Sequence, residues 1–169
     1  MTRHQRTSLA FCIFLTGLFI AAGTALQAQG DRAGNRQGNA VNPSAKTEKL
    51  GSITVRISGI EDYKGKLMIG LYDNAEEFPD DGGQARGGAV RVTGPVHSYT
   101  FTDVPYGTWA IAVLHDSNEN GEMDLNWLGM PDEGYAFSNN ATAFFSAPDF
   151  EDARFVVNGD ITVKITIKY

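Results

Sequence analysis

The order of apolar and polar positions from Leu50 to Tyr169 is that of short β-strands. Apolar residues recur at every second position in several runs, which gives each strand one face for a core and one face for water. Another run is apolar on both faces, which is typical of a central strand. The alternating runs are 53–57, 67–71, 97–101 and 161–167, and the run that is apolar on both faces is 109–114.

Turn signals separate these runs. Asn158-Gly159 lies between a short apolar run, 155–157, and the last strand, and Asn-Gly in that position predicts a β-hairpin. No segment keeps a helical period, and the best candidate, 74–78, is one turn at most. About seven short strands therefore predict one all-β domain, a single antiparallel β-sandwich of the immunoglobulin or transthyretin type. Residues 116–150 remain as one long loop, and a loop of that length is usually functional or packed internally.

The start of the chain is typical of a secretory signal. Two arginines near the start are followed by the mostly apolar run 9–22 and by small residues up to Ala28. This order predicts a signal peptide over 1–28, cleaved after Ala25 or Ala28. The apolar run is shorter than the roughly 18–20 residues that a spanning helix needs, so no membrane span is expected after cleavage. We expect an exported protein, periplasmic or extracellular.

Residues 29–49 are rich in Gly, Asn, Gln and Ser, and we expect them to form a flexible linker before a domain of residues 50–169. The single cysteine, Cys12, lies in the predicted signal, so no disulfide is expected. Cleavage removes two arginines and changes the formal charge from −6 to (14 − 2) − 20 = −8. An acidic domain with no basic stripe is not expected to bind nucleic acid or an anionic membrane.

The strongest candidate for chemistry is the loop that follows the central strand. Its acids and amides alternate before a glycine, and this spacing matches the ligand positions of an EF-hand-type calcium loop. The predicted metal ligands are Asp116, Asn118, Asn120, Glu122 (through its backbone carbonyl) and Asp124. The twelfth position, normally a bidentate Glu, is Trp127, and a strand enters the loop instead of a helix. The alternative is an Asx-rich turn that binds no metal, and the residues leave both readings open.

Three aromatic residues follow in the same stretch. Trp127, Tyr135 and Phe137 stand beside amides and acids, and aromatic faces next to amide donors suit a sugar or a peptide. They are the predicted ligand-binding residues, with an unknown protein or glycan as the partner. The alternative is that these side chains fold back and cover one open edge of the sandwich.

The sequence shows no recognisable catalytic motif. Ser–His–Asp spacing, a Gly-rich phosphate loop and a Cys/His cluster are all missing from the sequence. We therefore expect a non-enzymatic binding or interaction module of the cell envelope, with calcium as the one candidate cofactor. Two alternatives stay open: a small hydrolase that uses His115 with Asp116 or Glu133, and a purely structural accessory domain.

Several motifs carry a family resemblance. They include Val-Pro-Tyr-Gly-Thr (104–108), His-Asp-Ser-Asn-Glu-Asn-Gly (115–121), Leu-Gly-Met-Pro (128–131) and Gly-Tyr-Ala-Phe-Ser-Asn-Asn (134–140). Residues 101–113 resemble the strand-turn-strand of transthyretin-like, or prealbumin-type, sandwiches. Over nearly all of its length after Leu50 the chain resembles a bacterial family of exported proteins called domain of unknown function 2141.

The resemblance implies an exported sandwich domain and implies no activity. Enzymes of the transthyretin-like group use a histidine/arginine site and end in Tyr-Arg-Gly-Ser. This chain ends in Ile-Lys-Tyr, so the resemblance does not transfer that activity.

Overall fold

The structure is a computed structural model that describes residues 48–80, 82–142 and 146–169. The predicted signal peptide and all but the last two residues of the predicted linker lie outside these ranges. Among the described residues, no helix is both long and apolar enough to cross a membrane.

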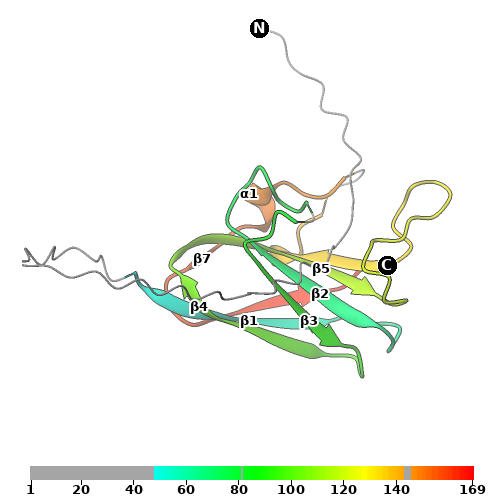
Figure 1. Ribbon diagram of the computed structural model, residues 1–169, viewed down its shortest axis with the longest axis horizontal. Helices are drawn as coiled ribbons and strands as arrows, with labels where there is room; N and C mark the ends of the chain where they lie inside the picture. The colour runs from blue at the N-terminus through cyan, green and yellow to red at the C-terminus, as the bar shows by residue number, and fades with distance from the viewer. Residues whose placement is uncertain (1–47, 81, 143–145) are drawn as a thin grey trace, which may run out of the picture. The chain divides into compact units, whose positions relative to one another are not determined.

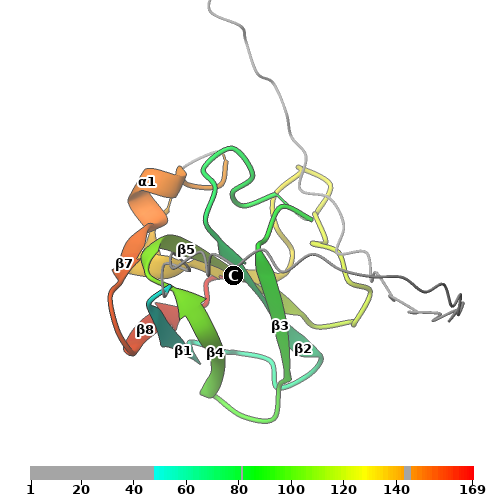
Figure 2. The ribbon, with the colours of Figure 1, turned by 60° about the vertical axis from the view of Figure 1, so that its left-hand side comes forward.

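Eight strands in the described ranges form two sheets, and Figures 1 and 2 show them facing each other. The strands are β1 (Leu50–Ser58), β2 (Lys66–Tyr72), β3 (Arg86–Arg91), β4 (His97–Pro105), β5 (Gly107–Asp116), β6 (Gly134–Phe137), β7 (Phe155–Val157) and β8 (Ile161–Thr166). One sheet has the order β4-β1-β8. The other has the order β3-β2-β5-β6, and β7 pairs with the start of β5. The predicted all-β sandwich is confirmed, with eight strands where the pattern predicts about seven.

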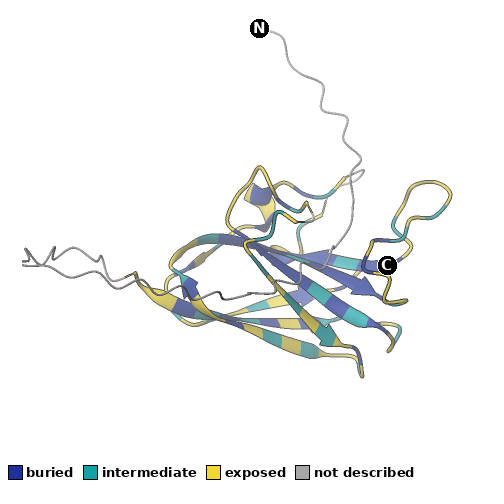
Figure 3. Ribbon diagram, in the orientation of Figure 1, coloured by how far each residue is buried: buried dark blue, intermediate teal, exposed yellow. Residues whose placement is uncertain are grey.

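The main core lies between the two sheets. Ile53, Val55 and Ile57 alternate along β1 and are completely buried, as their period of two predicts. Strand β5 is buried on both faces, because Ile111 points into this core while Ala110 points to a second apolar cluster on the other face of its sheet. Figure 3 shows this contrast between β1 and β5. The second cluster contains Tyr72, Phe78, Ala110, Phe137, Phe150 and Ala153.

The predicted β7–β8 hairpin is wrong. Strand β7 pairs with β5, and β8 pairs with β1 in parallel, with Ile53 opposite Ile161. Asn158-Gly159 therefore carries the chain from one sheet to the other. A turn sequence determines the local reversal of the chain, but the free edge of β1 decides where β8 pairs. The β1–β8 pair is also an exception to the antiparallel pairing that the pattern predicts.

The apolar/polar pattern also does not predict the short or irregular elements of the structure. The helix candidate 74–78 is wrong, because 75–79 form turns, whereas α1 (Phe150–Ala153) and the 3-10 turn η1 (Ser138–Asn140) were not predicted. Strand β3 was missed because its sequence, Arg-Gly-Gly-Ala-Val-Arg, has two glycines and little alternation. Strand β6 has four residues and lies inside the predicted long loop, so only 117–133 of that loop separates β5 from β6.

Candidate functional site

The candidate site is the segment 117–133, named here the β5–β6 loop. It extends away from the sheets and lies apart from α1 in both ribbon views (Figures 1 and 2). Its ends are fixed, because β5 enters it and β6, which pairs with β5, leaves it. The loop has two parts with different chemistry: a hydrogen-bonded base and a tip formed by 125–131.

Asp116, the last residue of β5, organises the base. Its side chain is completely buried, and its two oxygens accept the backbone N–H groups of Asn120 at 3.1 Å and Gly121 at 2.9 Å. The Lys66 ammonium lies 3.2 Å from Asp116 Oδ2. A buried carboxylate needs such partners, because leaving it unpaired is costly. Asp116 therefore closes the turn from within.

The structure brings three other predicted ligands together. The Asp124 carboxylate accepts the side-chain amides of Asn118 at 2.6 Å and Asn120 at 3.0 Å. The side-chain oxygen of Asn118 accepts the Asn120 N–H at 2.9 Å, and that of Asn120 accepts the Glu122 N–H at 2.8 Å. These are Asx turns. The described residues contain no group of three or more His, Cys, Asp or Glu side chains placed to hold a metal.

Glu133 connects the two ends of the loop. It is buried, and its Oε1 accepts the N–H of Ser117 at 2.9 Å and the hydroxyl of Ser117 at 3.1 Å. Its Oε2 accepts the N–H of Asp124 at 3.4 Å. The Glu133 side chain therefore joins three backbone segments of the base.

His115 is enclosed by partners on both ring nitrogens. It is completely buried, with Nε2 2.9 Å from the carbonyl oxygen of Lys64 and Nδ1 2.7 Å from the hydroxyl of Tyr169. A carbonyl only accepts, so Nε2 carries the proton and Nδ1 accepts the Tyr169 O–H. Burial raises the pKa of Tyr169 above its ordinary value. A general base needs a nitrogen within reach of its substrate, and this arrangement leaves neither nitrogen available.

The tip is a compact hairpin with a defined backbone. The Asn126 N–H donates to the Met130 carbonyl at 2.8 Å, and the Asn126 carbonyl accepts the Gly129 N–H at 2.8 Å. The side-chain oxygen of Asn126 accepts the N–H groups of Leu128 at 2.9 Å and Met130 at 3.2 Å. Gly129 has a φ of 76°, which glycine adopts without strain. The tip is therefore held by its own hydrogen bonds.

The side chains of the tip are apolar and exposed. The exposed fractions are 91% for Trp127, 64% for Leu128, 49% for Met130 and 44% for Leu125. The other two predicted ligand-binding aromatics lie elsewhere: Tyr135 is half-buried on β6, and Phe137 is buried in the second apolar cluster. The structure therefore separates Trp127 from Tyr135 and Phe137, which belong to strand β6 and pack at the second apolar cluster.

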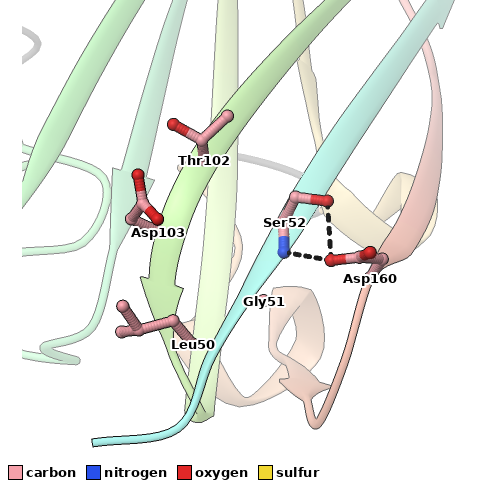
Figure 4. A pocket seen from close by; sticks show the side chains of 6 residues that line it. All are labelled: Leu50, Gly51, Ser52, Thr102, Asp103 and Asp160. Carbon is pink, nitrogen blue, oxygen red and sulfur yellow. Dashed lines mark hydrogen bonds between the residues drawn. The ribbon is translucent and has the colours of Figure 1, made fainter.

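A shallow pocket of about 320 Å³ lies at the start of β1, beside the end of β4 and the residue that precedes β8. The Ser52 N–H and hydroxyl both donate to Asp160 Oδ1 at 2.9 Å (Figure 4). No histidine or lysine lines the pocket, and the polar partner of the Ser52 hydroxyl there is the Asp160 carboxylate. The lining residues are Leu50, Gly51, Ser52, Thr102, Asp103 and Asp160.

Sequence reasoning did not single out five residues of this site. Leu125, Leu128 and Met130 complete the apolar tip, Lys66 pairs with Asp116, and Tyr169 binds His115. The sequence does carry a pattern that indicates the tip, because 125–131 is an uncharged, largely apolar run inside an acidic loop. Lys66 and Tyr169 had no such signal, because their partners are far away in the chain.

Comparison with known proteins places the chain in one family. The family described as "Uncharacterized protein conserved in bacteria (DUF2141)" matches residues 55–165, which span both sheets and the whole β5–β6 loop. No curated protein and no solved structure matches the chain.

Proposed function

We propose that this chain, which belongs to the uncharacterised bacterial family DUF2141, is an exported, non-enzymatic interaction module of the cell envelope. Its working surface is the tip of the β5–β6 loop. The observation that carries the proposal is the exposure of Trp127, at 91%, on a backbone held by hydrogen bonds.

Exposed apolar area on a rigid support favours binding. A tryptophan side chain offers about 150–250 Å² of surface, and removing apolar surface from water is worth about 25 cal/mol per Å². Trp127 alone could therefore contribute several kcal/mol when a partner covers it. The backbone bonds around Asn126 lower the entropy lost on binding, because the tip is already ordered.

Fluorine NMR on fluorotryptophan-labelled protein tests the working surface. The chain has two tryptophans, Trp109 and Trp127, so buried Trp109 serves as an internal control. We expect solubilised envelope material from the source bacterium to shift the Trp127 resonance and leave that of Trp109 unchanged. Excess unlabelled wild-type protein should reverse the shift, and unlabelled Trp127→Ala should not. A Trp127 resonance that responds to no envelope fraction would contradict the proposal.

Export has a separate test. The composition of 1–28 predicts a cleaved signal. Fractionation of the source bacterium followed by N-terminal sequencing should find the protein outside the cytoplasm, beginning just after Ala25 or Ala28. Uncleaved protein in the cytoplasm would contradict export.

Calcium binding at the base of the loop is a second proposal, because the side chains of Asn118, Asn120 and Asp124 converge. Calorimetry should give a dissociation constant below about 1 mM, in the range of extracellular calcium modules. Bound calcium should also raise the melting temperature by mass action. Asp124→Ala should abolish both effects, whereas the matched change Asp132→Ala should keep them. The absence of heat and of a melting shift in the wild type would leave the base as an Asx-rich turn.

A further inference from the structure

We propose that the tip binds a protein partner that offers an apolar pocket bordered by lysine or arginine side chains. The inference rests on the proposed function, because it specifies what covers the working surface. Three observations support this choice of partner: the charge around the tip, the side chains beside Trp127 and the shape of the hairpin.

The surroundings of the tip are acidic. Residues 116–133 contain six acids and no lysine or arginine. Two of the acids have cations nearby: Asp116 lies 3.2 Å from Lys66, and Glu119 lies 3.4 Å from Arg91. The acids that take part in no salt bridge between described residues are Glu122, Asp124, Asp132 and Glu133. Since Glu133 is buried, a net negative charge from the other three borders the apolar tip.

This charge disfavours a lipid surface as the occupant. Anionic membranes attract proteins through lysine and arginine side chains, and the loop has none. Asp124 and Asp132 directly flank 125–131, so they would approach the lipid headgroups as the tip inserts. Their repulsion acts within a Debye length, about 8 Å at physiological ionic strength.

The side chains beside Trp127 disfavour a glycan. Sugar recognition needs polar groups around an aromatic face, because the hydroxyls of a sugar must keep their hydrogen bonds. The exposed neighbours of Trp127 are Leu128, Met130 and Leu125, which offer no donor. The side-chain oxygen of Asn126 already accepts two backbone N–H groups, which leaves one side-chain amide NH₂ as the polar side-chain donor of 125–131 besides the Trp127 ring N–H, fewer than the several hydroxyls of a sugar need.

A protein pocket fits the remaining properties. Tryptophan and methionine are enriched in interface cores, charged residues are depleted there, and single aromatic anchors often carry most of the binding energy. The tip combines these features, with Trp127 as the anchor and acids only at its border. A protruding hairpin suits a concave surface, and a border of basic residues would complement the acids.

Photocrosslinking in the source bacterium, followed by reconstitution, tests the inference. A photoreactive residue replaces Leu128, which is exposed on the tip, and the matched control replaces Thr162, which is exposed on β8. We expect one protein to be captured from position 128 and not from 162. That protein is then purified, and its affinity for the wild type, Trp127→Ser and Asp132→Asn is measured by calorimetry at low and high salt.

We expect Trp127→Ser to weaken binding by about 30-fold or more, as for a central anchor. Salt should weaken wild-type binding, and Asp132→Asn should reduce that salt dependence. Two results would overturn the inference. One is an affinity for the captured protein that does not change with salt, and the other is an affinity that is the same for the wild type and Trp127→Ser.

Other occupants are tested with the purified protein. The probes are vesicles of phosphatidylethanolamine with and without phosphatidylglycerol, peptidoglycan fragments, and the protein alone in sedimentation velocity. Binding of the tip to vesicles or glycan, or dimerisation lost in Trp127→Ser, would overturn the inference and leave the proposed function standing. A Trp127 resonance that no envelope fraction shifts would overturn both.

Discussion

The two tryptophans of the chain lie at opposite extremes of exposure. Trp109 on β5 is 5% exposed, packs in the core between the sheets, and donates its Nε1–H to the Pro105 carbonyl at 3.0 Å. Trp127 is 91% exposed on the tip. The same side chain therefore packs in the core in one place and is exposed to water in the other.

The difference lies in which groups of each region have partners inside the protein. Around Trp109, both the ring and its polar atom have partners inside the protein. Around Trp127, the backbone is held by hydrogen bonds that Asn126 and Gly129 make, while the Trp127 side chain is exposed to water. The tip is ordered by polar groups, so its apolar side chains are not needed to form a core of their own.

The largest effect is expected for Trp109→Ala. Truncating a buried tryptophan removes transfer free energy and leaves a cavity, which costs about 3–5 kcal/mol. Trp127→Ala should change the free energy of unfolding by less than about 0.5 kcal/mol, because its ring lies in water. Urea unfolding of both variants measures the contrast, and equal losses would mean that Trp127 packs in the folded protein.

The next effect concerns the base of the loop. Asp116→Ala should destabilise the protein by about 2–3 kcal/mol, because two backbone N–H groups and the Lys66 ammonium lose their acceptor. Asp132→Ala, a change of the same type at an exposed acid, should have almost no effect. Thermal and urea unfolding of the pair provide the measurement. A neutral Asp116→Ala would show that the base does not depend on this carboxylate.

A smaller effect is expected at the C-terminal end of the chain. Tyr169→Phe removes the hydroxyl that binds His115 Nδ1 and accepts the Glu61 N–H at 3.3 Å. The loss should be about 1 kcal/mol, since both hydrogen bonds are made by a half-exposed residue and the Glu61 N–H can bind water instead. Tyr63→Phe, at another exposed tyrosine, serves as the control. Equal stability of the two variants would contradict a role for the His115–Tyr169 bond.

The same tyrosine predicts a dependence on alkaline pH. Burial raises the pKa of Tyr169 above its ordinary value of 10.0, so the folded state holds this proton more tightly than the unfolded state. The resulting stability is present below pH 10 and is lost as pH rises through the folded-state pKa. As pH rises above 10.0, the wild type should therefore lose stability more steeply than Tyr169→Phe. Parallel curves for the two proteins would show that Tyr169 does not contribute.

The smallest effect on global stability is expected for Asn126→Ala. It removes the side-chain acceptor of two backbone N–H groups, at Leu128 and Met130, in an exposed hairpin. The free energy of unfolding should change by less than about 0.5 kcal/mol. Amide hydrogen exchange at these two residues should become much faster. Unchanged exchange would mean that the hairpin is held without Asn126, and the entropy argument for binding at the tip would fail.

Local patterns predicted much of this molecule. The alternation in β1 and β8, the doubly apolar β5 and the Asx turns of the loop follow from neighbouring residues, whose periods and side-chain lengths determine them. The predicted convergence of Asn118, Asn120 and Asp124 is of this kind, because they lie within seven positions. Strands such as β3, with two glycines, carry too weak a pattern to be recognised.

Long-range packing decided the rest. The sequence by itself determined that the chain forms strands, that an acidic Asx-rich loop follows β5, and that an uncharged apolar run lies inside that loop. Only the tertiary structure decided that β7 and β8 join different sheets, that His115 meets Tyr169, and that Trp127 remains in water. Periodicity and Asx turns depend on near neighbours, whereas strand pairing, long-range hydrogen bonds and burial depend on which distant segment reaches a free edge or face.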